Sequence, residues 1–310
     1  MSEATQPIIP WMGGKRRLAG QLLPLFPPHE CYVELFTGGA ALFFMREHPA
    51  KTDVINDING ELVNLYRVVR CHFDEFCRHF EFMLGSREDW DWFQAVNLKT
   101  LTDIQRAVRF FFLQQHAFGG KIDGQNFGYA TTGRAFDIAS VRERLAAAHR
   151  RLSGAYIEHG DWLTCVERYD RPHTFFYADP PYWETTGYGV DFEWTQFERL
   201  ASAMRDMKGK LMLSINDHPD IAALFSEFWM RRLEIKYTVS NSTDLKTSGE
   251  LVICNFTPEE KTGGAVLISG YLKKAPCGAL AYKNLAITVR MAPIDVTKPV
   301  AISIGYHLDS

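Results

Sequence analysis

The sequence has no hydrophobic run long enough to span a membrane, and its cysteines do not follow the spacing of a disulfide framework. A membrane helix needs roughly 18 consecutive apolar residues, and the longest apolar runs here are interrupted by charges. The six cysteines are scattered along the chain, which is typical of reduced thiols. The first residues are polar and lack the pattern of a secretion signal. We therefore expect a cytoplasmic protein with no membrane contact.

The chain also lacks the net positive charge that is the simplest sign of a nucleic-acid-binding protein. Its formal net charge is −3. Basic residues gather locally, in the run Lys15-Arg16-Arg17 and between residues 101 and 160, where eight Lys and Arg face five Asp and Glu. Such patches are enough for phosphate contact, but charge alone does not predict DNA as the partner.

Strand-like and helix-like segments alternate along most of the chain. We expect strands at 31–36, 52–57, 155–158, 174–178, 210–215, 233–239 and 251–256. Helices are expected at 40–46 and, because apolar residues recur at helical spacing, over a long stretch at 60–82. This alternation predicts an α/β fold whose sheet is mostly parallel and covered by helices on both faces.

Two segments do not fit the alternation. Residues 85–154 are rich in Arg, His, Gln and aromatic residues, and 118–133 hold five glycines without a regular period. We interpret 85–154 as an inserted, mostly helical lobe. The catalytic domain would then comprise 1–84 and 155–257, and 258–310 would form a β-rich C-terminal extension whose role the sequence does not indicate.

The strongest chemical motif is Asp179-Pro180-Pro181-Tyr182, directly after the predicted strand 174–178. Ligands of such sheets bind outside the carboxyl ends of the strands. Two prolines remove two N–H donors, so their carbonyls and the Asp179 carboxylate offer only acceptors, which match the two hydrogens of an exocyclic amino group. Tyr182 offers an aromatic face to a base taken out of its stack. The alternative is a turn that happens to hold two prolines.

Two further segments could bind a nucleotide-like ligand. Glu34–Ala40 places Phe36, Gly38 and Gly39 between a strand and a helix, where the backbone can approach a ligand. Asp57 ends the next strand and is positioned to accept hydrogen bonds from ribose hydroxyls, or else to cap a helix. Near the N-terminus, Trp11–Lys15 could cradle a carboxylate, or form a simple turn.

Taken in order, these motifs resemble the Dam-type family of DNA adenine-N6 methyltransferases, as found in phages and prophages. The matching segments are Trp11–Lys15, Glu34–Gly39, Asn56–Asn59, Asp179–Tyr182 and the later 214–218. The resemblance implies a Rossmann-like methyltransferase fold with a target-recognition lobe, S-adenosylmethionine as cofactor, double-stranded DNA as partner, and no metal. It also implies that Trp11, Lys15, Asp57 and Asp179 contact the cofactor. Asp161 and Trp162 occupy the place of a pair that holds the cofactor's adenine in some members.

The target sequence cannot be predicted, because the insertion departs from the pattern of GATC-specific members at 118–121 and 126–129. Within this region we expect Lys121 and Asn126 to read bases and Arg142 to contact phosphate; an amide can bond an adenine edge bidentately. Methylation of RNA adenine or cytosine N4, and a DNA-binding module without catalysis, remain alternatives. The sequence leaves open whether a companion restriction enzyme exists, and we expect a monomer or weak dimer.

Overall fold

The computed structural model describes residues 4–117, 124–128, 137–185, 192–235 and 248–259. The chain divides into two units, Met1–Pro258 and Glu259–Ser310, and the description below concerns the first. The predicted β-rich extension lies almost wholly outside the described residues. Within them, no helix is both long and apolar enough to cross a membrane.

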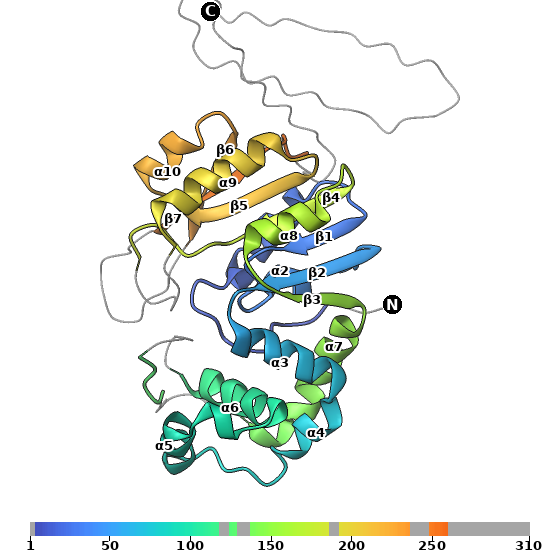
Figure 1. Ribbon diagram of the computed structural model, residues 1–310, viewed down its shortest axis with the longest axis vertical. Coiled ribbons are helices and arrows are strands. Elements are labelled where there is room, and N and C mark those ends of the chain that lie inside the picture. The colour runs from blue at the N-terminus through green and yellow to red at the C-terminus, as the bar shows by residue number, and fades with distance from the viewer. Residues whose placement is uncertain (1–3, 118–123, 129–136, 186–191, 236–247, 260–310) are drawn as a thin grey trace, which may run out of the picture. The chain divides into compact units, whose positions relative to one another are not determined.

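A seven-stranded sheet runs through the first unit (Figure 1). Its order is β3-β2-β1-β4-β5-β7-β6; the first five strands are parallel, and β7 is antiparallel to both of its neighbours. The strands are β1 Cys31–Glu34, β2 Thr52–Asp57, β3 Ala155–His159, β4 Thr174–Ala178, β5 Lys210–Asn216, β6 Trp229–Ile235 and β7 Ser248–Cys254. The predicted α/β fold with a mostly parallel sheet is confirmed.

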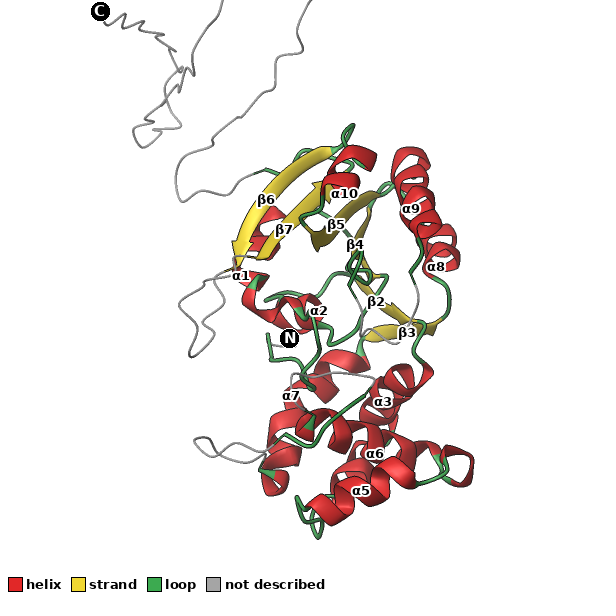
Figure 2. Ribbon diagram, turned by 90° about the vertical axis from the view of Figure 1, so that its left-hand side faces the viewer, coloured by secondary structure: helices red, strands yellow, loops and turns green. Residues whose placement is uncertain are grey.

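Helices cover both faces of this sheet, because its central strands alternate apolar side chains between two cores. In β4, Phe175 and Tyr177 pack into one core, while Phe176 and Ala178 pack into the other. The first core includes the helices near the N-terminus, and the second includes those after β3 (Figure 2). These helices are α1 Ala19–Leu22, α2 Ala41–Met45 and α3 Gly60–Cys71 for the first core, and α8 Trp162–Tyr169, α9 Trp194–Asp206 and α10 Pro219–Leu224 for the second.

The chain between β2 and β3 forms a group of helices beside the β3 edge of the sheet (Figures 1 and 2). After α3 come α4 Phe73–Arg78, α5 Arg87–Ala95, α6 Asp103–His116 and α7 Val141–Ser153. The single long helix predicted at 60–82 is wrong, because the chain breaks at His72 (φ −130°, ψ 41°). The break directs Phe76 onto Phe111 of α6, with ring centroids 5.5 Å apart.

The last two strands differ from their predicted positions. The strand expected at 233–239 begins at Trp229, and the strand expected at 251–256 begins at Ser248. Pairing with each other sets these bounds, since Trp229 lies opposite Cys254 and Ile235 lies opposite Ser248. As a consequence Glu250 belongs to β7 and lies opposite Asn216 of β5, close to the carboxyl end of that strand.

Candidate active site

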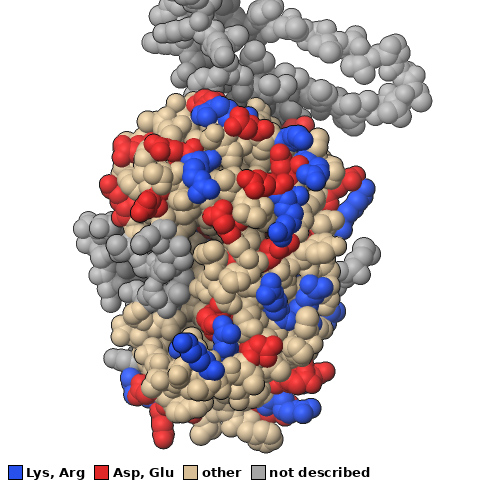
Figure 3. All heavy atoms as spheres, viewed as in Figure 1, with Lys and Arg blue, Asp and Glu red and all other residues tan. Residues whose placement is uncertain are grey.

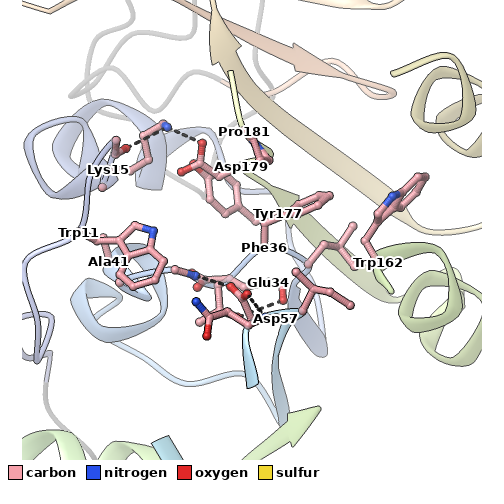
Figure 4. Close-up of a pocket in the computed structure, with 18 of the residues that line it drawn as sticks. Trp11, Lys15, Glu34, Phe36, Ala41, Asp57, Trp162, Tyr177, Asp179 and Pro181 are labelled. Atoms are coloured by element: carbon pink, nitrogen blue, oxygen red, sulfur yellow. Dashed lines mark hydrogen bonds and ion pairs between the residues drawn. The ribbon is translucent and has the colours of Figure 1, made fainter. Parts of the chain in front are cut away.

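A cavity of about 210 Å³ lies at the carboxyl ends of β1, β2 and β4. The strand order reverses between β1 and β4, which is where open α/β sheets bind ligands. Residues singled out in the sequence form much of its lining, and Figure 4 labels most of them. They are Trp11, Lys15, Phe36, Gly38, Asp57, Asp161, Trp162, Asp179 and Pro181.

Lys15 is the buried cation of this site. Its side chain is 3% exposed, whereas Arg16 and Arg17 of the same basic run are exposed. The ammonium group forms an ion pair with Asp179 (Figure 4) and lies 3.3 Å from Oε1 of Glu250. It also donates to the Tyr182 hydroxyl at 3.2 Å and to the carbonyl of Gly13 at 3.2 Å. Lys15 thus joins the N-terminal segment to the Asp179–Tyr182 motif.

The charges around Asp179 oppose one another. Burial raises the pKa of this carboxyl from 3.8 to about 6; the nearby ammonium of Lys15 lowers it, and the carboxylate of Glu250 raises it. Burial disfavours the charged form of Lys15, but Asp179 and Glu250 outweigh that effect and raise its pKa. At neutral pH Asp179 is therefore mainly ionised and able to accept hydrogen bonds. Ser214 donates one, at 3.4 Å.

The glycine turn after β1 is shaped by its contact with Trp11. Gly38 has φ +46°, and a Cβ there would lie 2.5 Å from Nε1 of Trp11, so only glycine fits. Its N–H donates to Oδ2 of Asp57 at 2.9 Å, and the N–H of Asn59 donates to Oδ1 at 2.9 Å. Burial raises the pKa of Asp57, and these bonds lower it. Asn59, and not Asp57, caps α3, so the helix-cap alternative for Asp57 is wrong.

Aromatic side chains line another side of the cavity. The ring of Phe36 lies 6.3 Å from that of Trp162 and 5.5 Å from that of Phe192, between centroids. Trp162 is fixed by a hydrogen bond from its Nε1 to Oε1 of Gln196, at 3.1 Å. Asp161 caps α8 by accepting from the N–H of Leu163 at 2.9 Å. These rings form a wall suited to a flat heterocycle.

Side chains of β5 and β7 form hydrogen bonds that hold Tyr182 and the backbone of the residue after it. The Tyr182 hydroxyl donates to Oε2 of Glu250 at 2.5 Å. The side chain of Asn216 brackets the backbone of Trp183, accepting from its N–H at 3.0 Å and donating to its carbonyl at 3.1 Å. Both contacts fix the course of the chain directly after the two prolines.

A second cavity, of about 650 Å³, lies beside the first and shares the Trp11–Lys15 segment as a wall. Tyr182 lines this second cavity and not the first. Three arginines also line it, Arg16, Arg17 and Arg144. On the face seen in Figure 3, by contrast, basic and acidic side chains are intermixed.

Of the residues predicted to contact DNA, Asn126 and Arg142 line neither cavity. Lys121 lies outside the described residues. Asn126 is exposed and lies next to Phe127, which bridges to Ala117. Arg142 is on α7 and forms an ion pair with Asp74 at 2.5 Å. Within the described part of the chain, no group of three or more His, Cys, Asp or Glu side chains could hold a metal ion.

Sequence reasoning gave no role to two buried acids, Glu34, which it included in the glycine-turn motif, and Glu250, which it did not single out. Glu34 lines the first cavity, and its Oε1 accepts from the Tyr32 hydroxyl and the Phe43 N–H, each at 2.6 Å. Burial raises the pKa of Glu34 from 4.5 to about 7. Each acid adjoins an apolar strand segment, and buried acids need partners. An acid next to a predicted buried strand is therefore a signal that could have identified both Glu34 and Glu250 as candidate site residues.

Comparison with known proteins decides the family. The model of the D12 class N6 adenine-specific DNA methyltransferases matches residues 11–241. The chain belongs to this family. It is therefore an adenine-specific DNA methyltransferase that uses S-adenosylmethionine, as the motifs predicted.

Relatives carry names of the same kind. Type II methyltransferase M.MjaIII of Methanocaldococcus jannaschii is 24% identical over 295 residues, which cover 81% of this chain and 99% of the relative. Type II methyltransferase M1.LlaDCHI of Lactococcus lactis subsp. cremoris is 24% identical over 279 residues, covering 81% and 95%. The DNA N-6-adenine-methyltransferase of Escherichia phage P1 is 24% identical over 249 residues, which cover 74% of this chain but 32% of the phage protein.

The first cavity fits this family's cofactor in its chemistry. S-adenosylmethionine combines a flat adenine, ribose hydroxyls and a positive sulfonium. The lining provides an aromatic wall at Phe36 and Trp162, and carboxylates at Asp57 and Asp179 that suit hydroxyl donors and a cation. The glycine turn brings backbone close to the same space.

Proposed function

We propose that this enzyme methylates N6 of an adenine that has been flipped out of double-stranded DNA, with Asp179–Tyr182 as the acceptor site. The observation that carries the proposal is the position of Asp179: it follows β4, contacts the Lys15 ammonium and lines the cavity beside Pro181. An ionised carboxylate there accepts one N6 hydrogen, and the carbonyl of Pro180 accepts the other. Both bonds direct the nitrogen lone pair toward the methyl group.

The first cavity is the proposed cofactor site. S-adenosylmethionine supplies a methyl group that its sulfonium already activates, so alignment is the main task of the protein. Asp57 would accept from the ribose hydroxyls, and Phe36 with Trp162 would hold the adenine. Trp11 and Gly38 would form the wall near the methionine moiety, with Asp161 at the rim beside Trp162.

The second cavity is the proposed site of the flipped base. Flipping costs roughly a few kcal/mol, and stacking on an aromatic ring returns about 1–3 kcal/mol. Tyr182 lines this cavity, and Arg16, Arg17 and Arg144 surround it. These arginines would contact phosphates and hold the duplex at the opening. Their contribution is electrostatic and independent of sequence.

Residues 85–154, which contain the helices α5, α6 and α7, are the proposed target-recognition lobe. Base edges specify a target, whereas phosphate contacts only position the protein. Lys121 and Asn126 are the proposed base-reading residues. Arg142 would contact phosphate only if its ion pair with Asp74 opens.

Expression in cells that lack adenine methylation, followed by genome-wide mapping of modified bases, tests the proposal. We expect N6-methyladenine within a short sequence motif, and none from the variant Asp179→Ala. Methylated cytosine, or methylated RNA without methylated DNA, would replace the proposal by one of its alternatives. Binding of S-adenosylmethionine without any methylated product would indicate a module without catalysis. Size-exclusion chromatography with light scattering would test the expected monomer or weak dimer.

A further inference from the structure

We infer that Glu250 is a positioning residue for methyl transfer, which fixes both the Lys15 ammonium and the Tyr182 ring around Asp179. The inference rests on the proposed function, since it assigns the reaction to Asp179 and Tyr182. Glu250 itself lines neither cavity. It therefore acts through the two residues that it holds.

Each oxygen of Glu250 has a different partner in the site. Oε1 lies 3.3 Å from the Lys15 ammonium, and Oε2 accepts from the Tyr182 hydroxyl at 2.5 Å. The side chain is 0% exposed, so water does not compete for these contacts. Three segments far apart in the sequence, at Lys15, Tyr182 and Glu250, are thereby tied together.

A carboxylate at this position is costly for folding alone. A buried ion carries a desolvation penalty that pairing only partly offsets, and an apolar residue would suit the interior of β7 better. Asp179 already provides one negative charge for Lys15. A second carboxylate is therefore unnecessary for neutralising the lysine, and its contacts point to the site.

The second carboxylate changes what Asp179 can do. Because the Lys15 ammonium is attracted to two carboxylates, it holds the Asp179 carboxylate less strongly than it would in an isolated ion pair. The carboxylate of Asp179 is then a better acceptor for an incoming amino group. Glu250 also raises the pKa of Asp179, whereas Lys15 lowers it, so the two neighbours act on this carboxyl in opposite directions.

The hydrogen bond to Tyr182 has a separate consequence. With its hydroxyl held by Glu250 and Lys15, the ring presents a fixed face to the second cavity. Loss of the bond to Glu250 would remove one of the contacts that fix the orientation of the ring. The Tyr182 ring would then be less well oriented in advance to stack on a bound base.

The variants E250Q and E250D separate charge from geometry. E250Q keeps an oxygen that can accept from Tyr182 but removes the negative charge. We expect single-turnover methylation at pH 7.5 to be at least tenfold slower than in wild type. The acidic limb of the pH–rate profile, which we expect near pH 6 in wild type, should move to lower pH. E250D keeps the charge but withdraws it by one methylene group. We expect a slower rate with an unmoved limb.

A matched control and the opposite outcomes complete the test. E227Q removes an exposed carboxylate that pairs with Arg205 and should leave rate and limb unchanged. An E250Q enzyme within twofold of wild type, or with an unmoved limb, would overturn the inference. If E250Q does not fold, Y182F removes the same hydrogen bond from the other side, and an unchanged rate there would overturn it. Failure of the wild-type enzyme to methylate DNA adenine would instead reject the proposed function.

Discussion

The raised pKa of Asp179 predicts that the ionised carboxylate, which the proposed methyl transfer needs, destabilises the folded protein. A carboxyl that titrates near pH 6 when folded and near 3.8 when unfolded binds its proton more tightly in the native state. Its contribution to stability is therefore fully present below about pH 3.8 and is lost as the pH rises to about 6. At about 1.4 kcal/mol for each pH unit, ionised Asp179 destabilises the folded protein by about 3 kcal/mol at pH 7.5.

The variant Asp179→Asn should remove this pH dependence and also abolish methyl transfer. The free energy of unfolding of the variant minus that of wild type should increase between pH 4.5 and pH 7.5. Proton linkage sets this increase at about 2 kcal/mol. Urea unfolding of both proteins at several pH values measures the difference. The comparison is internally controlled, since the side chains have the same shape and differ least at low pH. A difference that stays constant with pH would refute the reasoning, as would an active Asn variant.

Three further predictions concern the cofactor and DNA. Asp57→Asn should weaken S-adenosylmethionine binding at least tenfold in calorimetric titration, because charge-assisted hydrogen bonds contribute about 1.5–3 kcal/mol; unchanged affinity would remove Asp57 from the cofactor site. Asn126→Ala should relax the sequence preference of methylation without changing cofactor affinity, and an unaltered methylation motif would contradict base reading. Arg16→Ala should weaken binding to all DNA sequences and reduce the slope of log affinity against log salt by about one; an unchanged slope would argue against a phosphate contact.

Much of the fold could be predicted because its signals are local. Four of the five residues of the strand 174–178 are aromatic or aliphatic, the exception being Thr174, and the structure buries all five. The cavity at the ends of β1 and β4 follows from the same pattern, since parallel strands with helical connections place their carboxyl ends on one side. Asp57 and Asp179 could accordingly be placed at one edge of the sheet before their distances were known, and the family resemblance added Trp11 to the same site.

Features that depend on pairing could not be predicted in this way. The break at His72 is set by the packing of Phe76 on Phe111, and β6 and β7 take their bounds from each other. The basic run at residues 15–17 reads as one surface patch, yet Lys15 is buried and Arg16 is exposed. Only the carboxylates brought by β4 and β7 explain why a lysine is tolerated inside.

The Trp11–Lys15 segment has a role that follows from its two faces. It forms part of the wall of both cavities, and it is held at one end by Trp11 against Gly38 and at the other by Lys15 against Asp179. A shift of this segment would change the proposed cofactor cavity and the proposed base cavity together. Gly38 supports the Trp11 anchor and Glu250 supports the Lys15 anchor, although neither has to touch the transferred methyl group.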